Sequence, residues 1–281
     1  MKKVISRYLS PGTLEAVKKD LGFLIEKIKQ SGFEYGLQIR DDYLNLYYKG
    51  NSLGKISYCK SKDLYEVKIH RKFAEGIGET ALKRFKYSPE KEYFVFTIAS
   101  KQLHPLFSSR NLLSMGQRVK EVQFQEEIVF EQMLLTDNVD GDDLIIIDRQ
   151  VVDRNNSTKM DLLAVKRNGA SDYQFCVLEV KLGNNVELKE KVFSQLTGYI
   201  ERIEKNFDVY KECYEKNIQQ KQELGLLQKG LKVNIVNGAL GVVVVGGYSG
   251  LAKKSIAELK ARHPGIKVLH LRNEINFSKV Q

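Results

Sequence analysis

Two neighbouring stretches decide the fold of this chain: KMDLLAV at residues 159–165 and QFCVLEVK at residues 174–181. Both are apolar enough for buried strands, and the polar residues between them predict a hairpin turn. Side chains alternate faces along a strand, so Glu179 and Lys181 are expected to point the same way. Burying these charges beside apolar residues is costly unless they have partners. With Asp161 on the neighbouring strand, two carboxylates and one ammonium are expected to meet in one cleft.

Such a pair of carboxylates suits a divalent cation. Mg²⁺ prefers oxygen ligands and keeps several waters, so Asp161 and Glu179 would suffice, with the backbone carbonyl of Val180 as a third oxygen. The ion would neutralise charge on a phosphodiester and activate a water, and Mn²⁺ could replace it. Lys181 would lie near the attacking water or the scissile phosphate, as a charge stabiliser or a proton acceptor. The pattern predicts a metal site for phosphodiester hydrolysis.

Two expected helices add polar candidates. In a helix over about residues 115–135, Glu127 and Glu131 are four apart and share one face. Either could reach a metal or its water, or simply belong to a solvated face. The helix after the second strand has Gln195 and Tyr199, also four apart. Gln195 could orient a water or contact a phosphate while Tyr199 braces it, but a boundary glutamine and a core tyrosine would show the same spacing.

The α-β-β-β-α-β order expected over residues 115–247, with these motifs, resembles the PD-(D/E)xK nuclease superfamily, closest to its RecB-like branch. The resemblance implies a restriction-endonuclease-like core, a mixed sheet flanked by helices that hydrolyses nucleic acid with a metal ion. Met160 stands where the family has a proline before its aspartate, a common relaxation. The catalytic residues that the resemblance implies are Asp161, Glu179, Lys181, Gln195 and Glu127, the last ahead of Glu131.

The pattern along the whole chain predicts two domains, residues 1–110 and 111–281, with a linker near residues 103–114. The first is expected to be a small α+β domain with a helix over residues 14–28 and an antiparallel sheet. Strands are expected at 35–39, 43–48, 55–59, 64–70 and 93–99, then at 144–152, 160–165, 174–181, 240–245 and 267–271. Further helices are expected at 186–203, 207–229 and 255–262, and a turn at 155–157.

The charge distribution favours a nucleic-acid partner. Residues 1–112 hold 21 Lys and Arg against 12 Asp and Glu, whereas residues 113–281 hold 24 against 23. A basic domain attracts polyanions, and DNA is expected ahead of RNA. Its tyrosines either stack on bases or are simply good strand formers; they are Tyr35, Tyr43, Tyr47, Tyr48, Tyr58 and Tyr65. The candidate nucleic-acid contacts are Arg71, Lys72, Lys83, Arg84, Lys86 and Tyr199.

Several other classes of protein find no support in the sequence. The three cysteines have no C-x-x-C spacing and the four histidines form no close pair, which disfavours a zinc site and a disulfide framework. No apolar run is long enough to span a bilayer and no secretory signal is seen, so we expect a cytoplasmic protein, at the nucleoid in a prokaryote. P-loop and G-x-S-x-G motifs are absent.

The expected function is therefore a Mg²⁺-dependent DNA endonuclease, with a homodimer attractive because one site cuts one strand. The basic N-terminal domain would bind the duplex or form the dimer contact. One alternative is a catalytically silent nucleic-acid-binding or assembly module on the same fold. Another is an unrelated α/β enzyme that uses the acidic pair differently.

Overall fold

The chain divides into two compact units. The first comprises Ser6–Val139 and Cys213–Leu231, and the second comprises Met1–Ile5, Asp140–Glu212 and Lys232–Gln281. The boundary expected near residue 110 therefore falls inside the first unit. The residues that the computed structural model describes are 4–123, 125–138, 141, 143–152 and 158–273. The turn expected at 155–157 lies outside them.

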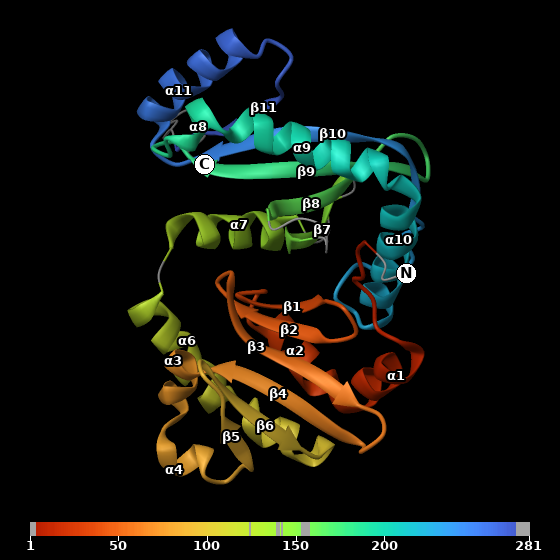
Figure 1. Cartoon of the computed structure of the whole chain (residues 1–281), viewed down its shortest axis with the longest axis vertical. Helices are drawn as coiled ribbons and strands as arrows, with labels where there is room; N and C mark the ends of the chain where they lie inside the picture. The colour runs from red at the N-terminus through yellow and green to blue at the C-terminus, as the bar shows by residue number, and fades with distance from the viewer. Residues whose placement is uncertain (1–3, 124, 139–140, 142, 153–157, 274–281) are drawn as a thin grey trace, which may run out of the picture. The chain divides into compact units, whose positions relative to one another are not determined.

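The first unit is built on a six-stranded antiparallel sheet in the order β1-β2-β3-β4-β6-β5 (Figure 1). Alternation decides which face is buried: in β4, Tyr65, Val67 and Ile69 are buried, while Glu66 and Lys68 lie on the other, half-buried face. The strands are β1 (Tyr35–Ile39), β2 (Leu44–Tyr48), β3 (Asn51–Cys59), β4 (Leu64–His70), β5 (Tyr87–Pro89) and β6 (Tyr93–Ile98). The expected small antiparallel α+β architecture is confirmed here.

Helices pack against the apolar face of this sheet to form one core. The helices of this unit are α1 (Pro11–Asp20), α2 (Gly22–Gln30), α3 (Arg71–Ala74), α4 (Glu79–Leu82), α5 (Leu103–Leu106), α6 (Ser109–Val122), α7 (Glu126–Asp137) and part of α10 (Phe207–Glu223). The single helix expected over residues 14–28 is two helices, because Leu21 leaves the helical conformation with φ −113° and ψ 8°. Leu21 is fully buried, so packing fixes this break.

Two other expectations for this region are wrong. The linker expected at residues 103–114 is helical, since Ser108 caps α6 by accepting a hydrogen bond from the Asn111 backbone N–H. The long helix expected over residues 115–135 is two helices, because Gln123 leaves the helical conformation (φ −151°, ψ 44°) at the end of α6. Tyr35, Tyr47, Tyr48 and Tyr65 are buried, so these four tyrosines serve the core rather than an open stacking face.

The second unit contains a five-stranded mixed sheet in the order β11-β10-β9-β8-β7. β7, β8 and β9 form an antiparallel meander, and β10 and β11 continue it in parallel. The strands are β7 (Leu144–Val151), β8 (Met160–Arg167), β9 (Asp172–Leu182), β10 (Asn234–Gly246) and β11 (Val268–Leu271). The expected mixed sheet is thus confirmed, and β10 begins earlier than the expected residue 240.

Helix α9 (Val192–Lys205) crosses one face of the mixed sheet between β9 and β10 (Figure 1). It approaches most closely at Gly241, where an added Cβ would lie 2.7 Å from side-chain atoms of Leu196 and Ile200. Gly241 pairs with Val177 in β9, and residues two apart share a face, so α9 covers the face that also carries Glu179. The remaining helices are α8 (Glu187–Glu190), α11 (Ser249–Arg262) and the first turns of α10.

Two helices in the second half of the chain differ from their expected bounds. The helix expected over residues 186–203 is split into α8 and α9, and the one expected to reach residue 229 ends at Glu223, before Gly225 with φ 72°. Within the described residues, no helix combines the length and the apolar character that crossing a membrane requires.

Candidate active site

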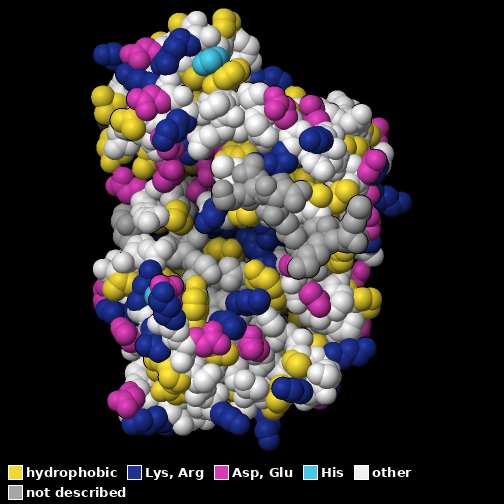
Figure 2. Space-filling model, viewed as in Figure 1, with side chains coloured by type: hydrophobic (Ala, Val, Ile, Leu, Met, Phe, Trp, Pro, Cys, Tyr) yellow, Lys and Arg dark blue, Asp and Glu magenta, His cyan; other side chains and the backbone are white. Residues whose placement is uncertain are grey.

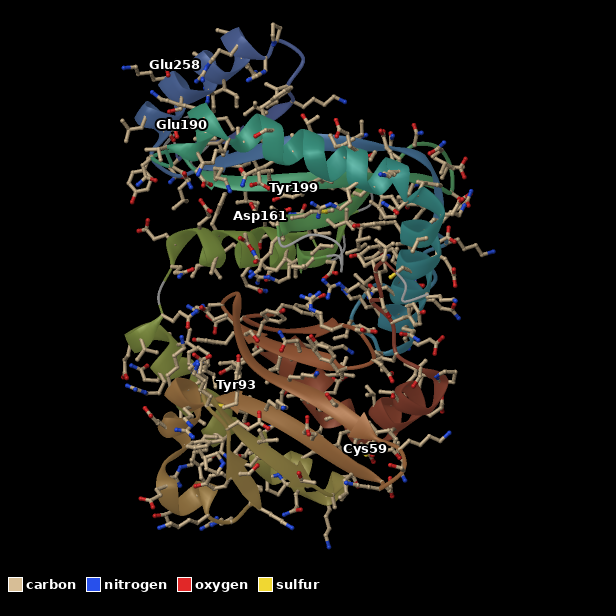
Figure 3. The ribbon with its side chains drawn as sticks, viewed as in Figure 1. Cys59, Tyr93, Asp161, Glu190, Tyr199 and Glu258 are labelled. Atoms are coloured by element: carbon tan, nitrogen blue, oxygen red, sulfur yellow. The ribbon has the colours of Figure 1, made fainter. Side chains whose placement is uncertain are left out.

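Asp161 and Glu179 face one another across the β8–β9 hairpin. The paired register runs from Arg167 opposite Tyr173 to Leu162 opposite Leu178, and one further step sets Asp161 opposite Glu179. Lys181 Nζ lies 2.9 Å from Glu179 Oε1 and 3.4 Å from Asp161 Oδ2. Figure 3 labels Asp161 on this sheet beside Tyr199. The structure therefore brings together the three side chains that strand alternation joins in the sequence.

These charges are almost completely removed from solvent. The side chains of Asp161, Glu179 and Lys181 are 13%, 1% and 5% exposed. Charges desolvated this far need close partners, and removing one partner is far more costly than at the surface. Asp161 Oδ2 also accepts the Val180 backbone N–H at 2.9 Å, which fixes the carboxylate to the neighbouring strand. The Val180 side chain is buried on the opposite face, and its carbonyl as a metal ligand stays a prediction.

Glu187 is a third carboxylate at this site, and sequence reasoning missed it. Its Oε2 lies 3.8 Å from Lys181 Nζ, and its Oε1 lies 3.6 Å from Lys191 Nζ. Asn185 Oδ1 accepts the Glu187 backbone N–H at 2.9 Å and so positions the first turn of α8. The signal in the sequence was the asparagine shortly after the E-x-K strand, followed by an acidic residue two positions on.

Tyr199 reaches the same face from α9, and Gln195 lies one turn earlier on that helix. Burial, and after it the negative charges of Glu179 and Asp161, raise the pKa of Tyr199 to about 12. The neutral hydroxyl donates to the Lys159 carbonyl at 2.6 Å. Gln195 Oε1 is buried and has no hydrogen-bond partner among the described residues. Tyr199 is therefore a bracing residue, 3% exposed with little surface for nucleic acid, while Gln195 has an acceptor to offer.

The strand next to Asp161 is irregular. The β7–β8 register shifts between Ile146 and Asp148, and Gln150, which follows in β7, has φ 49°. Bulges and left-handed non-glycine residues cost energy and are frequent beside functional sites. Asp148 is fully buried, and its Oδ1 accepts the Arg149 backbone N–H at 2.8 Å. Nothing in the sequence predicts this bulge.

The remaining sequence candidates belong to the first unit. Glu127 and Glu131 lie on α7, with Glu131 only 2% exposed, and their part in the site stays a prediction. Lys83 pairs with Glu79 at 2.8 Å, and Lys72 lines a pocket described below. Basic and acidic side chains are interspersed on the visible face of both units (Figure 2). Arg71 stacks over the Phe94 ring, while Arg84 and Lys86 are exposed.

Among the described residues, no three His, Cys, Asp or Glu side chains are arranged as a ready-made metal cage. Mg²⁺ does not require one, since one or two carboxylates with waters are its usual protein ligands. In comparisons with known proteins, no family model, no curated protein and no solved structure matches this chain. The geometry of Asp161, Glu179 and Lys181 is therefore the main indication of function.

Proposed function

We propose that the second unit is a Mg²⁺-dependent DNA endonuclease that hydrolyses phosphodiester bonds, in restriction, repair or defence against foreign DNA. The single observation that supports this most is the desolvated cluster in which Lys181 Nζ lies within 3.4 Å of both Asp161 and Glu179. Two carboxylates with one ammonium leave a net negative charge, which a divalent cation would balance. The four-stranded order β10-β9-β8-β7 agrees with the core that the nuclease resemblance implies.

The donor set fits a hard cation. Asp161 and Glu179 supply carboxylate oxygens from adjacent strands, and Glu187 adds a third carboxylate beside the same ammonium. The buried Oε1 of Gln195 offers a further acceptor for a water. Asp161 and Glu179 would hold the ion, which when bound neutralises phosphate charge and makes its water more acidic.

The chain's own residues supply the rest of the chemistry. The Lys181 ammonium would stabilise the negative charge that grows on the phosphate oxygens as water attacks phosphorus. Gln195 Oε1 would accept a hydrogen bond from that water and orient it. Tyr199 holds α9 against β8 through its bond to the Lys159 carbonyl. Hydrolysis adds the water oxygen to phosphorus, breaks the phosphorus–oxygen ester bond and leaves a proton on the departing sugar oxygen.

A cleavage assay tests the proposal. The protein is incubated with plasmid, linear duplex, single-stranded DNA and RNA in Mg²⁺, Mn²⁺ or EDTA, beside the Asp161→Asn and Lys181→Gln variants. The matched controls are Asp143→Asn and Lys166→Gln: these side chains, 72% and 44% exposed, form a 3.8 Å ion pair on the same hairpin region. Cutting that needs metal, disappears in both site variants and persists in both controls supports the proposal.

Three results would overturn it. Binding of nucleic acid without cutting, in every metal, would favour the alternative of a catalytically silent binding or assembly module. No interaction with any of these substrates would favour an unrelated enzyme that uses the acidic pair for another reaction. Equal loss of cutting in Lys181→Gln and Lys166→Gln would show that general charge, and not this cluster, matters.

A further inference from the structure

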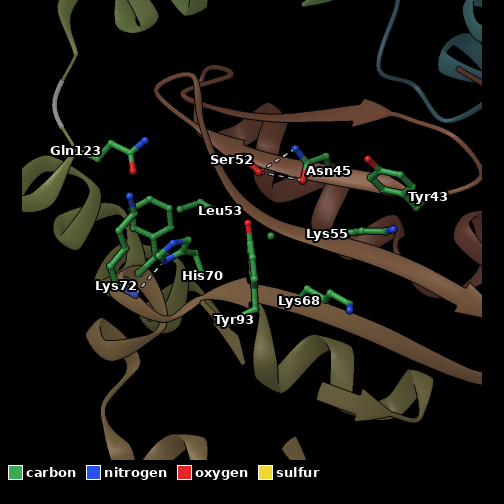
Figure 4. Close-up of a pocket in the computed structure, with 12 residues that line it drawn as sticks. Tyr43, Asn45, Ser52, Leu53, Lys55, Lys68, His70, Lys72, Tyr93 and Gln123 are labelled. Carbon is green, nitrogen blue, oxygen red and sulfur yellow. Dashed lines mark hydrogen bonds between the residues drawn. The ribbon is translucent and has the colours of Figure 1, made fainter. Parts of the chain in front are cut away.

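A pocket of about 390 Å³ lies on the open face of the antiparallel sheet of the first unit. It is formed by alternate residues of neighbouring strands: Asn45 pairs with Lys55, Lys55 with Lys68, and His70 with Tyr93. Figure 4 shows Tyr93 standing between His70 and Lys68. Ser52, Leu53, Gly54 and Gln123 complete the wall together with Tyr43, Lys72 and Phe73. The volume is that of a small-ligand site.

The pocket is cationic and has no acidic wall. Its described lining includes Lys55, Lys68, Lys72 and His70 but no Asp or Glu. Lys55 and Lys68 are direct cross-strand neighbours, an arrangement of like charges that destabilises a sheet unless an anion compensates. Lys68 is partly compensated by Glu90 at 3.2 Å and Glu66 at 3.7 Å. Cation clustering of this kind favours an anionic ligand.

Lys55 and Lys72 have a different environment from Lys68. Within the part of the chain that the structure describes, neither forms an ion pair with a carboxylate within 4 Å. Lys55 Nζ instead lies over the Tyr43 ring, 3.9 Å from its centroid, and Lys72 Nζ lies 5.1 Å from the Phe73 centroid. Aromatic faces position an ammonium without neutralising its charge. Both lysines therefore keep a full charge available for a ligand.

The pocket also presents a flat aromatic surface next to these charges. Tyr93 is 40% exposed although it is a large apolar ring, and its edge meets His70 at 5.3 Å between centroids. Polar groups come from β2 and β3, where the Asn45 side-chain amide donates a hydrogen bond to the Ser52 hydroxyl at 2.9 Å. An exposed ring beside two uncompensated ammonium groups matches a planar base attached to a phosphate.

We propose that this pocket binds a nucleoside phosphate, with the base stacked on Tyr93 and the phosphate held by Lys55 or Lys72, which lie on opposite sides of that ring (Figure 4). The unit bound is either a free nucleotide or one residue of a single strand, which share this chemistry. Lys68 extends the cationic wall towards the phosphate, and Asn45 and Ser52 offer hydrogen bonds to the base or sugar. The proposal concerns the first unit and does not rest on hydrolysis by the second.

Calorimetric titration of the full chain in EDTA tests the proposal and keeps it separate from cleavage. The probes are adenosine and thymidine 5′-monophosphates, a thymidine hexanucleotide, ribose 5-phosphate and inorganic phosphate. We expect saturable binding of the nucleotides. Ribose 5-phosphate and inorganic phosphate should bind at least about tenfold more weakly, because they lack a base to stack. If the hexanucleotide binds more tightly, the natural ligand is a single strand. If a mononucleotide binds more tightly, the natural ligand is the free nucleotide.

Variants locate the site. Tyr93→Ala should weaken nucleotide binding about tenfold, whereas Tyr93→Phe keeps the stacking surface and the affinity. Lys55→Gln and Lys72→Gln should each weaken binding and flatten its salt dependence. The controls are Lys101→Gln, an exposed lysine outside the pocket, and Tyr248→Ala, a tyrosine 47% exposed in the second unit; neither should change the affinity or its salt dependence. Absence of saturable nucleotide binding, equal affinity for phosphate alone, or unchanged binding in Tyr93→Ala would each overturn the proposal.

Discussion

The two sheets of this protein treat lysine in opposite ways. In the mixed sheet, Lys181 is 5% exposed and surrounded by the carboxylates of Asp161, Glu179 and Glu187. At the antiparallel sheet, Lys55 of β3 and Lys72 of α3 line a pocket among aromatic rings. The first arrangement supplies its counter-charge from within the fold, whereas the second leaves the counter-charge to a ligand. A buried lysine is thus part of a balanced cluster, and a pocket lysine is a binding group.

Removing Lys181 should break this comparison most strongly. In Lys181→Ala the carboxylates of Asp161 and Glu179 lose their ammonium while they remain desolvated, so we expect the free energy of unfolding to fall by about 3–5 kcal/mol in EDTA. Cleavage should fall by about 10³-fold. Urea unfolding with and without Mg²⁺ checks the first effect, and added Mg²⁺ should recover part of the lost stability, because it binds the folded site.

The matched change at the pocket of the first unit is Lys72→Ala. Its ammonium contacts only an aromatic ring among the described residues, so the unfolding free energy should change by less than about 0.5 kcal/mol. A large destabilisation by Lys72→Ala, or none by Lys181→Ala, would show that the two lysines do not differ as the structure indicates.

The contact between α9 and β10 should give the next largest effect, because it holds the helix that carries Tyr199 and Gln195 against the sheet. At Gly241 a Cβ would come within 2.7 Å of Leu196 and Ile200, so Gly241→Ala should destabilise the protein by about 1–3 kcal/mol and slow cleavage. Gly198, on α9 itself, has no atom within 4 Å of an added Cβ. Gly198→Ala should therefore stabilise the protein by about 0.5–1 kcal/mol. Thermal unfolding of both variants decides whether the signs are opposite.

The sequence predicted the site through local rules and missed what depends on tertiary packing. Alternation and a turn were enough to join Asp161 to Glu179 and Lys181, because antiparallel hairpin pairing is local. The break at Leu21 was missed although Gly22 follows it directly, because a single glycine is also tolerated inside a helix and the burial of Leu21 that fixes the break is tertiary. Residues 213–231 belong to the first unit because they contact residues far away in the sequence. Lys221 Nζ, for example, donates to Gln38 Oε1 at 2.7 Å, although the two residues are 183 positions apart.

Tyr199→Phe should give a smaller effect in the mixed sheet. It removes only the hydroxyl that donates to the Lys159 carbonyl at 2.6 Å, and a net hydrogen bond contributes about 0.5–1.5 kcal/mol. Cleavage should fall little if Tyr199 braces α9, because the ring still fills its site. Chemical denaturation and single-turnover cleavage measured together separate the two roles: loss of cutting without loss of stability would place the hydroxyl on the substrate.

The smallest expected effect concerns His70 in the antiparallel sheet. Burial lowers the pKa of His70, and the charge of Lys72 lowers it further, while Glu92 and Glu75 oppose this. Nδ1 accepts the Lys72 backbone N–H at 3.3 Å, so the neutral ring has its proton on Nε2, and the rings of Phe73 and Tyr93 pack beside it. The unfolded chain therefore binds the proton that charges the His70 ring more readily than the folded chain does.

Stability contributed by neutral His70 is thus complete above the unfolded value of about 6.5 and is lost as pH falls through the window between that value and the lower folded pKa. Urea unfolding at about pH 8 and about pH 5 should show this loss in the parent and a smaller one in His70→Gln. An NMR titration of the His70 ring should show its pKa rising when a nucleoside phosphate binds, because the anion favours the charged ring. A folded pKa at or above the unfolded value would contradict both expectations and would place His70 with Lys181, as a group whose charge the fold itself compensates.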